Sequence, residues 1–299
     1  MTKLSVVVNT YNEAKLLSRA LDSVKSIADE IVIVDMHSSD DIEAVAKKYG
    51  AAIYQHERVS YVEPVRNFAL SKATGDWILL IDPDEELPTS LKEKIKETIL
   101  DSNADFFRIP RKNLIFGKWI KHAKWWPDYN IRLFKKGKVA WSEIIHSVPT
   151  TIGRGLDIKD EERYAIVHYH YESVDQYIEK MIRYTSAQSM NKISQGYKFN
   201  FDDLVKNPIN EFISRFFREA GYKDGVHGFA LSGLQAFSEF ITLLKVWQND
   251  NFVDAKVNIE NTINNIKKSE ADLRYWEADT LLKEQGSLWQ RIKRKYRLP

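Results

Sequence analysis

The first third of the chain alternates short apolar runs with amphipathic segments. The apolar runs are residues 4–8, 30–34, 51–55 and 77–81. Continuous apolar runs of this length are typical of strands that are covered on both faces of a sheet. The segments between them that have a helical pattern are residues 14–26, 42–49 and 64–72. This alternation predicts an α/β fold with a mostly parallel, doubly wound sheet and helices on both of its faces.

The pattern changes after residue 100. Residues 101–149 are aromatic and irregular, and helical periodicity returns beyond them. The long helices predicted from this periodicity are residues 173–192, 212–247 and 252–283. We therefore predict a catalytic domain over residues 1–172, with two halves that meet near residue 100, and a helical region over residues 173–299.

The composition excludes several classes of protein. The 44 basic and 42 acidic residues nearly balance, which argues against a chain whose main role is to coat nucleic acid. Because the chain has no cysteine, it has no disulfide framework, thiolate metal site or thiol nucleophile. No run reaches the roughly 18 apolar residues of a membrane span, since residues 229–247 contain Gln235, Glu239 and Lys245. We expect a protein that touches a membrane surface without crossing it.

Carboxylates are concentrated directly after the apolar run at residues 77–81. Residues 82–86 read Asp-Pro-Asp-Glu-Glu, and ligands of such sheets bind at the carboxyl ends of the strands. In an extended conformation Asp82 and Asp84 project to the same side, where they could share a divalent cation and a diphosphate. For Glu85 and Glu86 an equal alternative is that they stabilise the positive end of the next helix. The sequence predicts a cation site after this strand.

Polar residues also follow the first two predicted strands. Residues 9–13 read Asn-Thr-Tyr-Asn-Glu, residues 35–41 read Asp-Met-His-Ser-Ser-Asp-Asp, and Arg66-Asn67 lies in the helix before the acidic run. With the Asp-Pro-Asp sequence, these segments in this order resemble the family 2 glycosyltransferases over residues 1–100. The resemblance implies a Rossmann-like GT-A fold and the inverting transfer of a hexose from a UDP-sugar donor.

The same resemblance implies roles for individual residues. Asp35 would bind the uracil imide, and Asp84 would bind the metal directly. The residues implied to bind the nucleotide sugar are Thr10, Tyr11, Glu13, Asp35, Arg66 and Asp82. A simpler role for Asp35 is that of a turn or capping residue before the next helix. For Asn12, Asp40 and Asn67 the capping role and the functional role are equal alternatives.

A finer resemblance, to bacterial lipopolysaccharide-core glucosyltransferases, continues beyond residue 100. It is carried by residues 126–137 (Trp-Pro-Asp-Tyr-Asn-Ile-Arg-Leu-Phe-Lys-Lys-Gly), Ile145-His146 and residues 166–169 (Ile-Val-His-Tyr). It implies that His168 completes the coordination of a Mn²⁺ or Mg²⁺ ion beside Asp84, because carboxylate and imidazole ligands suit these ions. A histidine buried for structural reasons is the alternative, and His170 is the weaker choice of ligand.

An inverting transfer needs a base that takes the proton from the acceptor hydroxyl. The metal neutralises the departing diphosphate, so no separate general acid is required. The candidates for the base are Glu143, His146 and Asp128. A carboxylate such as Glu143 needs little tuning, whereas His146 titrates closer to neutral pH. Relatives often have His-Glu where this chain has His146-Ser147, so the identity of the base stays open.

The expected acceptor is a cell-surface glycan or a lipid-linked sugar. Arg132 could meet an acidic acceptor. Tryptophans could stack on the sugars of the acceptor, although core packing is the more common role of such residues. The tryptophans in the region concerned are Trp119, Trp125, Trp126 and Trp141.

The C-terminal tail combines aromatic and basic residues. Residues 289–297 read Trp-Gln-Arg-Ile-Lys-Arg-Lys-Tyr-Arg. Such a pattern suits a helix that lies in the interface of an anionic bilayer. Packing on the catalytic domain or a dimer surface is the alternative. We expect a peripheral protein on the cytoplasmic face of the cell membrane.

Two other functions fit parts of the sequence. A nucleotidyltransferase also combines such a sheet with paired carboxylates, but it would normally have a glycine-rich phosphate-binding loop after the first strand. A catalytically inactive sugar-binding or scaffold relative is disfavoured by the intact Asp-Pro-Asp sequence. The absence of the glutamate after His146 favours that inactive relative.

Overall fold

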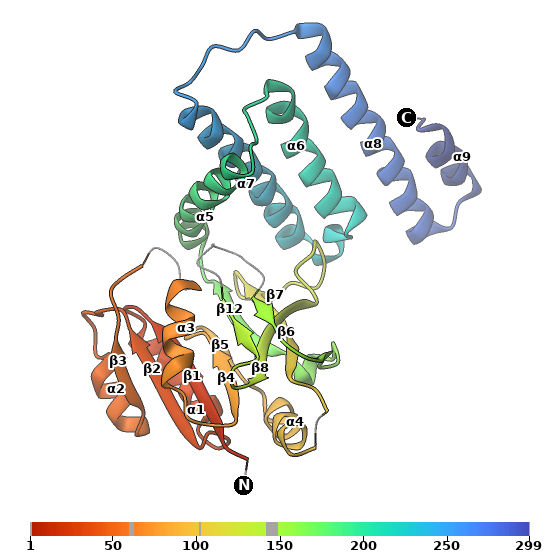
Figure 1. Cartoon of the computed structure of the whole chain (residues 1–299). Helices are drawn as coiled ribbons and strands as arrows, with labels where there is room; N and C mark the ends of the chain where they lie inside the picture. The colour runs from red at the N-terminus through yellow and green to blue at the C-terminus, as the bar shows by residue number, and fades with distance from the viewer. Residues whose placement is uncertain (1, 60–62, 102, 142–148, 299) are drawn as a thin grey trace. The chain divides into compact units, whose positions relative to one another are not determined.

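The computed structural model describes residues 2–59, 63–101, 103–141 and 149–298 of the chain (Figure 1). The chain forms two compact units. The first unit comprises Met1–Leu114 and Pro127–His170, and the second comprises Ile115–Trp126 and Tyr171–Pro299. The first unit is built on a sheet, and the second consists mainly of long helices.

The first unit begins with four parallel strands. They are β1 (Leu4–Thr10), β2 (Glu30–Asp35), β3 (Ala52–Gln55) and β4 (Trp77–Ile81), in the spatial order β3-β2-β1-β4. The helices that connect them are α1 (Ala14–Val24), α2 (Ile42–Tyr49) and α3 (Glu63–Lys72). The elements predicted over the first third of the chain are confirmed, with differences only at their ends. Because the strands are parallel, their carboxyl ends lie at one edge of the sheet.

Both faces of this sheet are covered, as predicted. Leu4 and Val6 of β1 belong to an apolar core that also includes residues of α1, α2 and α4 (Thr89–Leu100). Val7 points to the opposite face, where it shares a second core with Val65 of α3. Successive side chains of a strand point to opposite faces. The apolar run of β1 is uninterrupted because its side chains are buried on both faces of the sheet.

The sheet continues beyond β4 with antiparallel strands. β8 (Asp128–Lys135) pairs antiparallel with β4, and β6 (Phe106–Ile115) pairs antiparallel with β8. β12 (Ile166–Tyr171) and β5 (Glu85–Glu86) complete the order β4-β8-β6-β12-β5. The region interpreted as irregular therefore contains two long strands. Polar residues in the interior of both strands interrupt the alternation of apolar and polar positions by which a strand is predicted. The shorter elements are β7 (Lys118–Trp119), β9 (Val139–Ala140), β10 (Thr150–Thr151), β11 (Gly155–Asp157) and η1 (Glu162–Tyr164).

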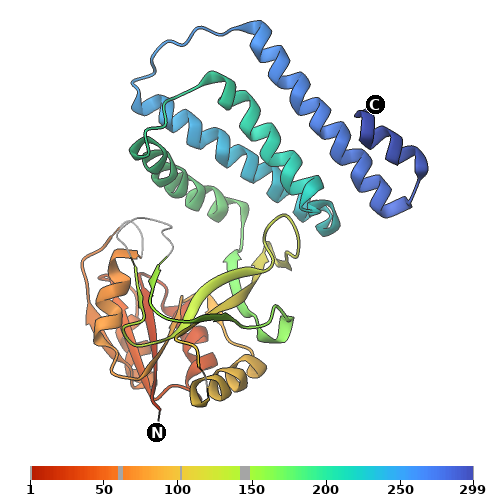
Figure 2. The ribbon, with the colours of Figure 1, turned by 45° about the vertical axis from the view of Figure 1, so that its right-hand side comes forward.

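The second unit consists mainly of helices. They are α5 (Val174–Ser194), α6 (Phe201–Ile213), α7 (Val226–Asn249), α8 (Ile259–Gln285) and α9 (Leu288–Tyr296). α6 and α7 lie side by side, and α9 packs against α8 (Figures 1 and 2). Asp224 ties the segment 115–126 to this unit, because its carboxylate accepts the backbone N–H groups of Lys121 and His122 at 3.2 and 2.9 Å. Residues 115–126 thus belong to the second unit, although the sequence predicts them in the catalytic domain over residues 1–172.

The prediction of one helix over residues 212–247 is wrong. α6 is followed by a π-helical turn, η2 (Ser214–Arg218), and a 3₁₀ turn, η3 (Gly221–Asp224), before α7 begins. Ala220 and Gly225 have φ angles of 55° and 66°, which a continuous helix cannot contain. The apolar pattern continues through the break because the turn also packs on α7, so periodicity could not reveal it. α8 also begins later than predicted, at its first residue Ile259.

α7 is long and apolar enough to cross a membrane, with a mean hydropathy of 1.2 over its most apolar window. This criterion uses length and composition only. A single helix of this kind is weak evidence for a membrane span, because core helices of soluble proteins meet the same criterion.

Gly228 of α7 is required by the close approach of the preceding turn. A Cβ atom at Gly228 would lie 1.7 Å from the carbonyl oxygen of Gly221, whereas a Cβ atom at Gly233 would meet no heavy atom of the described residues within 4 Å. We expect Gly228→Ala to lower the free energy of unfolding by about 1–3 kcal/mol because the turn must shift. The matched variant Gly233→Ala should raise it by up to about 1 kcal/mol, because alanine favours a helix. Urea denaturation followed by circular dichroism measures both values, and equal effects would contradict this packing.

Candidate functional site

The carboxyl ends of β1 and β2 place a threonine beside an aspartate. Thr10 and Asp35 are register partners in the parallel ladder, and both are buried. The Asp35 carboxylate accepts hydrogen bonds from the backbone N–H of Ser38 at 3.2 Å and from its hydroxyl at 2.5 Å. Within the described part of the chain, Thr10 Oγ1 and the side-chain amide of Asn9 are buried without a hydrogen-bond partner. Because buried polar groups are nearly always paired, this edge of the sheet has hydrogen-bonding capacity left for a ligand.

The two loops that follow these strands are tied together. Asn12 has a φ angle of 54°, and its backbone N–H donates to Ser38 Oγ at 2.8 Å. Its side-chain Oδ1 accepts the backbone N–H of Ser39 at 2.7 Å. Asp40 accepts the backbone N–H of Ala14 at 2.8 Å, at the start of α1. Asn12 and Asp40 therefore stabilise the loops, which is the simpler of the two roles considered for them.

Tyr11 and Glu13 lie on the first of these loops, directly after Thr10. Tyr11 is half-buried, and the guanidinium of Arg58 lies 4.1 Å from the centre of its ring. Glu13 is the N-cap residue of α1, where its carbonyl oxygen accepts the backbone N–H of Leu17 at 2.8 Å. Tyr11 therefore follows Thr10 directly, and Glu13 ends the loop at the start of α1.

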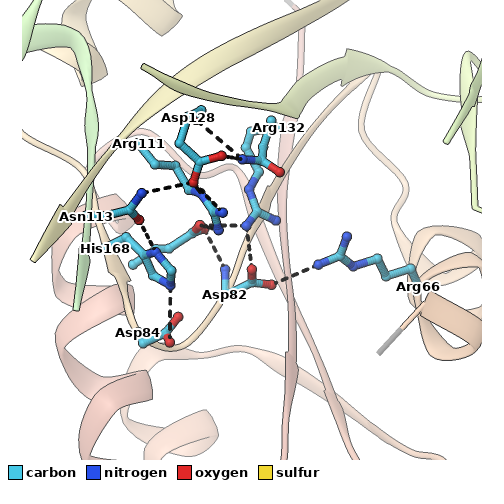
Figure 3. A network of polar contacts seen from close by, with 10 residues as sticks. Arg66, Asp82, Asp84, Arg111, Asn113, Asp128, Arg132 and His168 are labelled. Atoms are coloured by element: carbon cyan, nitrogen blue, oxygen red, sulfur yellow. Dashed lines mark hydrogen bonds and ion pairs between the residues drawn. The ribbon is translucent and has the colours of Figure 1, made fainter. Parts of the chain in front are cut away.

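The chain turns directly after β4. The backbone N–H of Glu85 donates to the carbonyl oxygen of Asp82 at 3.0 Å. The expectation that Asp82 and Asp84 project to the same side assumed an extended conformation and is wrong. In the turn, Asp82 faces Arg132 and Arg66, whereas Asp84 faces His168 (Figure 3).

Arg132 of β8 lies at the centre of a buried ion-pair cluster. Its guanidinium donates to Asp82 and, at 2.6 Å, to Glu85 Oε1. Arg132 is 2% exposed and Glu85 is fully buried. The expectation that Arg132 could meet an acidic acceptor is therefore wrong. Arg66 lies 3.3 Å from the other oxygen of Asp82. Burial alone would raise the pKa of Asp82, but the charges of Arg132 and Arg66 hold it well below its ordinary value.

A second series of contacts leads from β6 to Asp84. Arg111 and Asp128 are register partners, and Arg111 Nη2 donates to Asp128 Oδ2 at 2.6 Å. Asn113 Nδ2 donates to the same oxygen at 3.1 Å. Asn113 Oδ1 lies 2.6 Å from His168 Nδ1, and His168 Nε2 lies 3.5 Å from Asp84 Oδ2 (Figure 3). β6, β8, β12 and the turn after β4 thus converge on one point.

Asp128 has an unfavourable environment for a catalytic base. Burial raises the pKa of Asp128, but the charge of Arg111 and the hydrogen bonds from Asn113 and Arg111 lower it below its ordinary value. A carboxylate that is stabilised as an anion takes up a proton less readily. The other two candidates for the base, Glu143 and His146, lie outside the described residues.

Asn67 of α3 holds the chain immediately before those residues. Its Nδ2 donates to the carbonyl oxygen of Trp141 at 2.6 Å, and its Oδ1 accepts the Trp141 backbone N–H at 2.9 Å. Trp141 is buried against Phe134, with the guanidinium of Arg66 5.2 Å from its ring centre. Trp141 therefore belongs to the core, and Asn67 anchors the chain where it enters the segment that carries Glu143 and His146.

Comparison with known proteins decides the family. Residues 5–156 match the sequence profile described as Glycosyl transferase family 2. The chain belongs to glycosyltransferase family 2. The predicted enzyme class is therefore confirmed, and family membership together with the strand order confirms the α/β GT-A fold class.

Relatives of this transferase match it over most of its length. An uncharacterized glycosyltransferase of Rickettsia typhi is 30% identical, with 90% of this chain and 98% of the relative covered. The lipopolysaccharide core biosynthesis glycosyltransferase LpsC of Rhizobium meliloti is 25% identical, with 87% and 97% covered. Among solved structures, Staphylococcus aureus TarS 1–349 in complex with UDP superimposes with a TM-score of 0.45 at 15% identity, with 86% and 94% covered.

The transferase offers two ligands for a divalent cation. Asp84 would supply a carboxylate oxygen, a donor that suits Mn²⁺ and Mg²⁺, and His168 would supply an imidazole nitrogen, a donor that suits transition metals. In the described ranges, no group of three or more histidine, aspartate and glutamate residues could hold a metal by itself. Cations in nucleotide enzymes are commonly held by one or two carboxylates together with substrate phosphates. Two protein ligands therefore fit a cation whose remaining ligands would come from a substrate.

Arg111, Asn113 and Arg132 are the residues of this site whose roles sequence reasoning missed. They lie inside β6 and β8 among buried apolar residues such as Ile109 and Leu133. A charge buried in such a strand is costly unless it is paired. The presence of arginines among apolar strand residues could therefore have indicated buried ion pairs. Its partners could not be named because Asp82 lies 50 positions from Arg132 in the sequence.

Removal of Arg132 should strongly destabilise the transferase. Arg132→Leu leaves Asp82 and Glu85 without their shared cation, and breaking a buried ion pair typically costs about 3–5 kcal/mol. Arg108→Leu is the matched control, because Arg108 pairs with Asp157 at 2.7 Å while their side chains are 50% and 41% exposed. Such exposed pairs contribute about 0–1 kcal/mol. Urea denaturation measures both losses, and similar values for the two variants would show that the buried pair has no special weight.

Proposed function

We propose that the transferase moves a hexose from a UDP-sugar to a cell-surface glycan or a lipid-linked acceptor, with inversion at the anomeric carbon. The observation that carries this proposal is the position of two residue pairs at the same edge of the sheet. Thr10 and Asp35 are the last residues of β1 and β2, and Asp84, in the turn after β4, lies 3.5 Å from His168 of β12. The first pair suits a nucleotide base, and the second suits a cation on the diphosphate. The name of LpsC supports an acceptor on the cell surface.

Thr10 and Asp35 bind the base of the nucleotide in this proposal. Asp35 accepts the imide N–H of uracil, and Ser38 orients the carboxylate for this contact. An ionised carboxylate can accept further hydrogen bonds beyond those from Ser38. The Thr10 hydroxyl, which is buried without a partner among the described residues, pairs with a polar atom of the nucleotide. Tyr11 and Glu13 border the donor from the same loop.

The diphosphate lies against Arg66 and against a cation that Asp84 and His168 would hold. When bound, Mn²⁺ or Mg²⁺ supplies Lewis-acid neutralisation of the charge that develops on the departing diphosphate. Arg66, placed between Asp82 and Trp141, adds a fixed positive charge. Asp82 is kept anionic by Arg132 and can accept a hydrogen bond from the ribose. No general acid is needed, in contrast to a glycoside hydrolase.

The base that deprotonates the acceptor hydroxyl is Glu143 or His146. Asp128 is disfavoured because Arg111 and Asn113 stabilise its anion. Asn67 supports the proposal indirectly, since it fixes the chain at Trp141, next to the segment that carries both candidates.

Release of UDP from a panel of UDP-sugars, with and without an acceptor, tests the transfer. We expect one sugar to give release that depends on Mn²⁺ or Mg²⁺ and stops with EDTA. Asp84→Ala should lower the rate more than about 100-fold, because loss of a metal ligand removes several kcal/mol of transition-state stabilisation. Glu97→Ala, at an exposed carboxylate of α4, is the control and should retain the rate. Absence of both turnover and UDP binding by calorimetry would contradict the proposal.

We also propose that α9 binds the transferase to the cytoplasmic face of the membrane. Leu288, Trp289, Ile292 and Tyr296 are exposed at helical spacing. On another face of α9, Arg294 pairs with Asp279 of α8 at 2.7 Å. The helix thus packs against α8 through one face and presents the apolar residues to solvent. Lysines and arginines beside these residues favour an anionic lipid surface.

Vesicle sedimentation tests the proposed surface of α9. The doubly substituted variant Trp289→Ser with Ile292→Ser should bind vesicles that contain phosphatidylglycerol at least about tenfold more weakly, because each apolar side chain contributes about 1.5–3 kcal/mol when buried. Ile259→Ser with Ile263→Ser, at exposed apolar residues of α8, is the matched control and should bind as the wild type does. An equal loss in both variants, or no binding by the wild type, would contradict the role of α9.

A further inference from the structure

The orientation of the Asn113 amide is determined by its neighbour Asp128. Asn113 is fully buried, and its Nδ2 lies 3.1 Å from Asp128 Oδ2. An ionised carboxylate can only accept hydrogen bonds, and Arg111, which donates to the same oxygen at 2.6 Å, keeps Asp128 ionised. The NH₂ group of Asn113 must therefore face Asp128. Its carbonyl oxygen, Oδ1, faces the opposite way.

That carbonyl oxygen determines which nitrogen of His168 carries the hydrogen atom. Asn113 Oδ1 lies 2.6 Å from His168 Nδ1, a short hydrogen-bond distance. Since a carbonyl oxygen has no hydrogen to donate, Nδ1 must be the donor. In the neutral ring, Nε2 then carries a lone pair. The ring itself is held by burial and by stacking on His170, with ring centres 4.4 Å apart.

Nε2 of His168 faces Asp84 (Figure 3). The distance of 3.5 Å from Nε2 to Asp84 Oδ2 is too long for a good hydrogen bond. It suits two ligands of one cation, because ligands with bonds of about 2.1 Å lie about 3 Å apart or more when they share a metal. His168 Nδ1 thus donates to Asn113, and Asn113 donates in turn to Asp128. Asp128 accepts from Arg111 as well, so it is the common acceptor of the series.

We propose that Asn113 and Asp128 are positioning residues that hold His168 as the Nδ1–H tautomer and present its Nε2 to the cation bound by Asp84. This inference rests on the proposed cation site of the transferase. It assigns to Asp128 a task other than that of the catalytic base. Partners of this kind outside the metal ligands typically change metal affinity about 10–100-fold when they are removed.

The tautomer can be measured without any metal, by the ¹⁵N chemical shifts of the His168 ring in a two-bond ¹H–¹⁵N correlation spectrum of the full chain. The resonance is assigned by its absence in His168→Gln. We expect Nδ1–H in the wild type and loss of this preference in Asn113→Leu. Asn130→Leu is the matched control, because Asn130 Nδ2 also contacts Asp128, at 3.1 Å from Oδ1, and has no hydrogen bond to His168 among those of the described residues. Asp128→Asn is a second variant, since an amide there no longer enforces the orientation of Asn113.

Binding of Mn²⁺, followed by electron paramagnetic resonance, gives the second measurement. We expect Asn113→Leu to weaken the affinity about 10–100-fold and Asn130→Leu to leave it unchanged. An Nε2–H tautomer in the wild type, or an unchanged tautomer in both Asn113→Leu and Asp128→Asn, would overturn the inference. If the wild type has the expected tautomer but binds no Mn²⁺ with or without UDP, the cation site of the proposed function is wrong, and so is the ligand role of His168. If only the tautomer prediction is contradicted, the proposed function is still tested independently by the UDP-release experiment.

Discussion

The guanidinium of Arg132 lies in the interior of the first unit, where a charge without counterions would be far more costly than at the surface. Its counterions are Asp82 and Glu85, the first and last residues of the turn after β4. One cation that binds both ends of a turn restricts the conformations the turn can adopt. Asp84, between them, faces His168 at 3.5 Å. The position of the proposed cation ligand thus depends on an arginine that forms no ion pair with it.

Charges of opposite sign alternate through this site. Arg132 lies between Asp82 and Glu85, and Arg111 lies between Glu85, at 3.3 Å, and Asp128. The two series of contacts are therefore one network. Paired charges and oriented dipoles in such a network are arranged before a ligand arrives, which avoids the cost of reorganising them during the reaction. The carboxylates of this site therefore have different roles. Asp82, Glu85 and Asp128 pair with arginines, whereas Asp84 faces His168.

Many of the residues proposed to contact substrates lie at strand ends or in the loops that follow them, and the strands behind them supply rigidity. Ser38 and Asn12 join the loops after β1 and β2. Asn67 holds the chain at Trp141. This division is common in enzymes, because loops can vary while the scaffold fixes their ends. The second unit separates functions in a similar way, since one face of α9 packs against α8 and another remains exposed.

Apolar periodicity by itself determined the strands β1–β4 and the helices between them, because strands buried on both faces need continuous apolar runs. It also placed Thr10, Asp35 and the acidic residues at strand ends, where ligands of such sheets bind. The tertiary structure alone decided where their side chains point. The ion-pair and hydrogen-bond partners of Arg132 and His168 lie 47–84 positions away in the sequence, and their contacts depend on the register of β4, β8 and β6. A shift of one residue in that register would turn every side chain to the other face, so no local pattern could reveal these contacts. The break before α7 was likewise set by the close approach of Gly221 and Gly228, which periodicity does not encode.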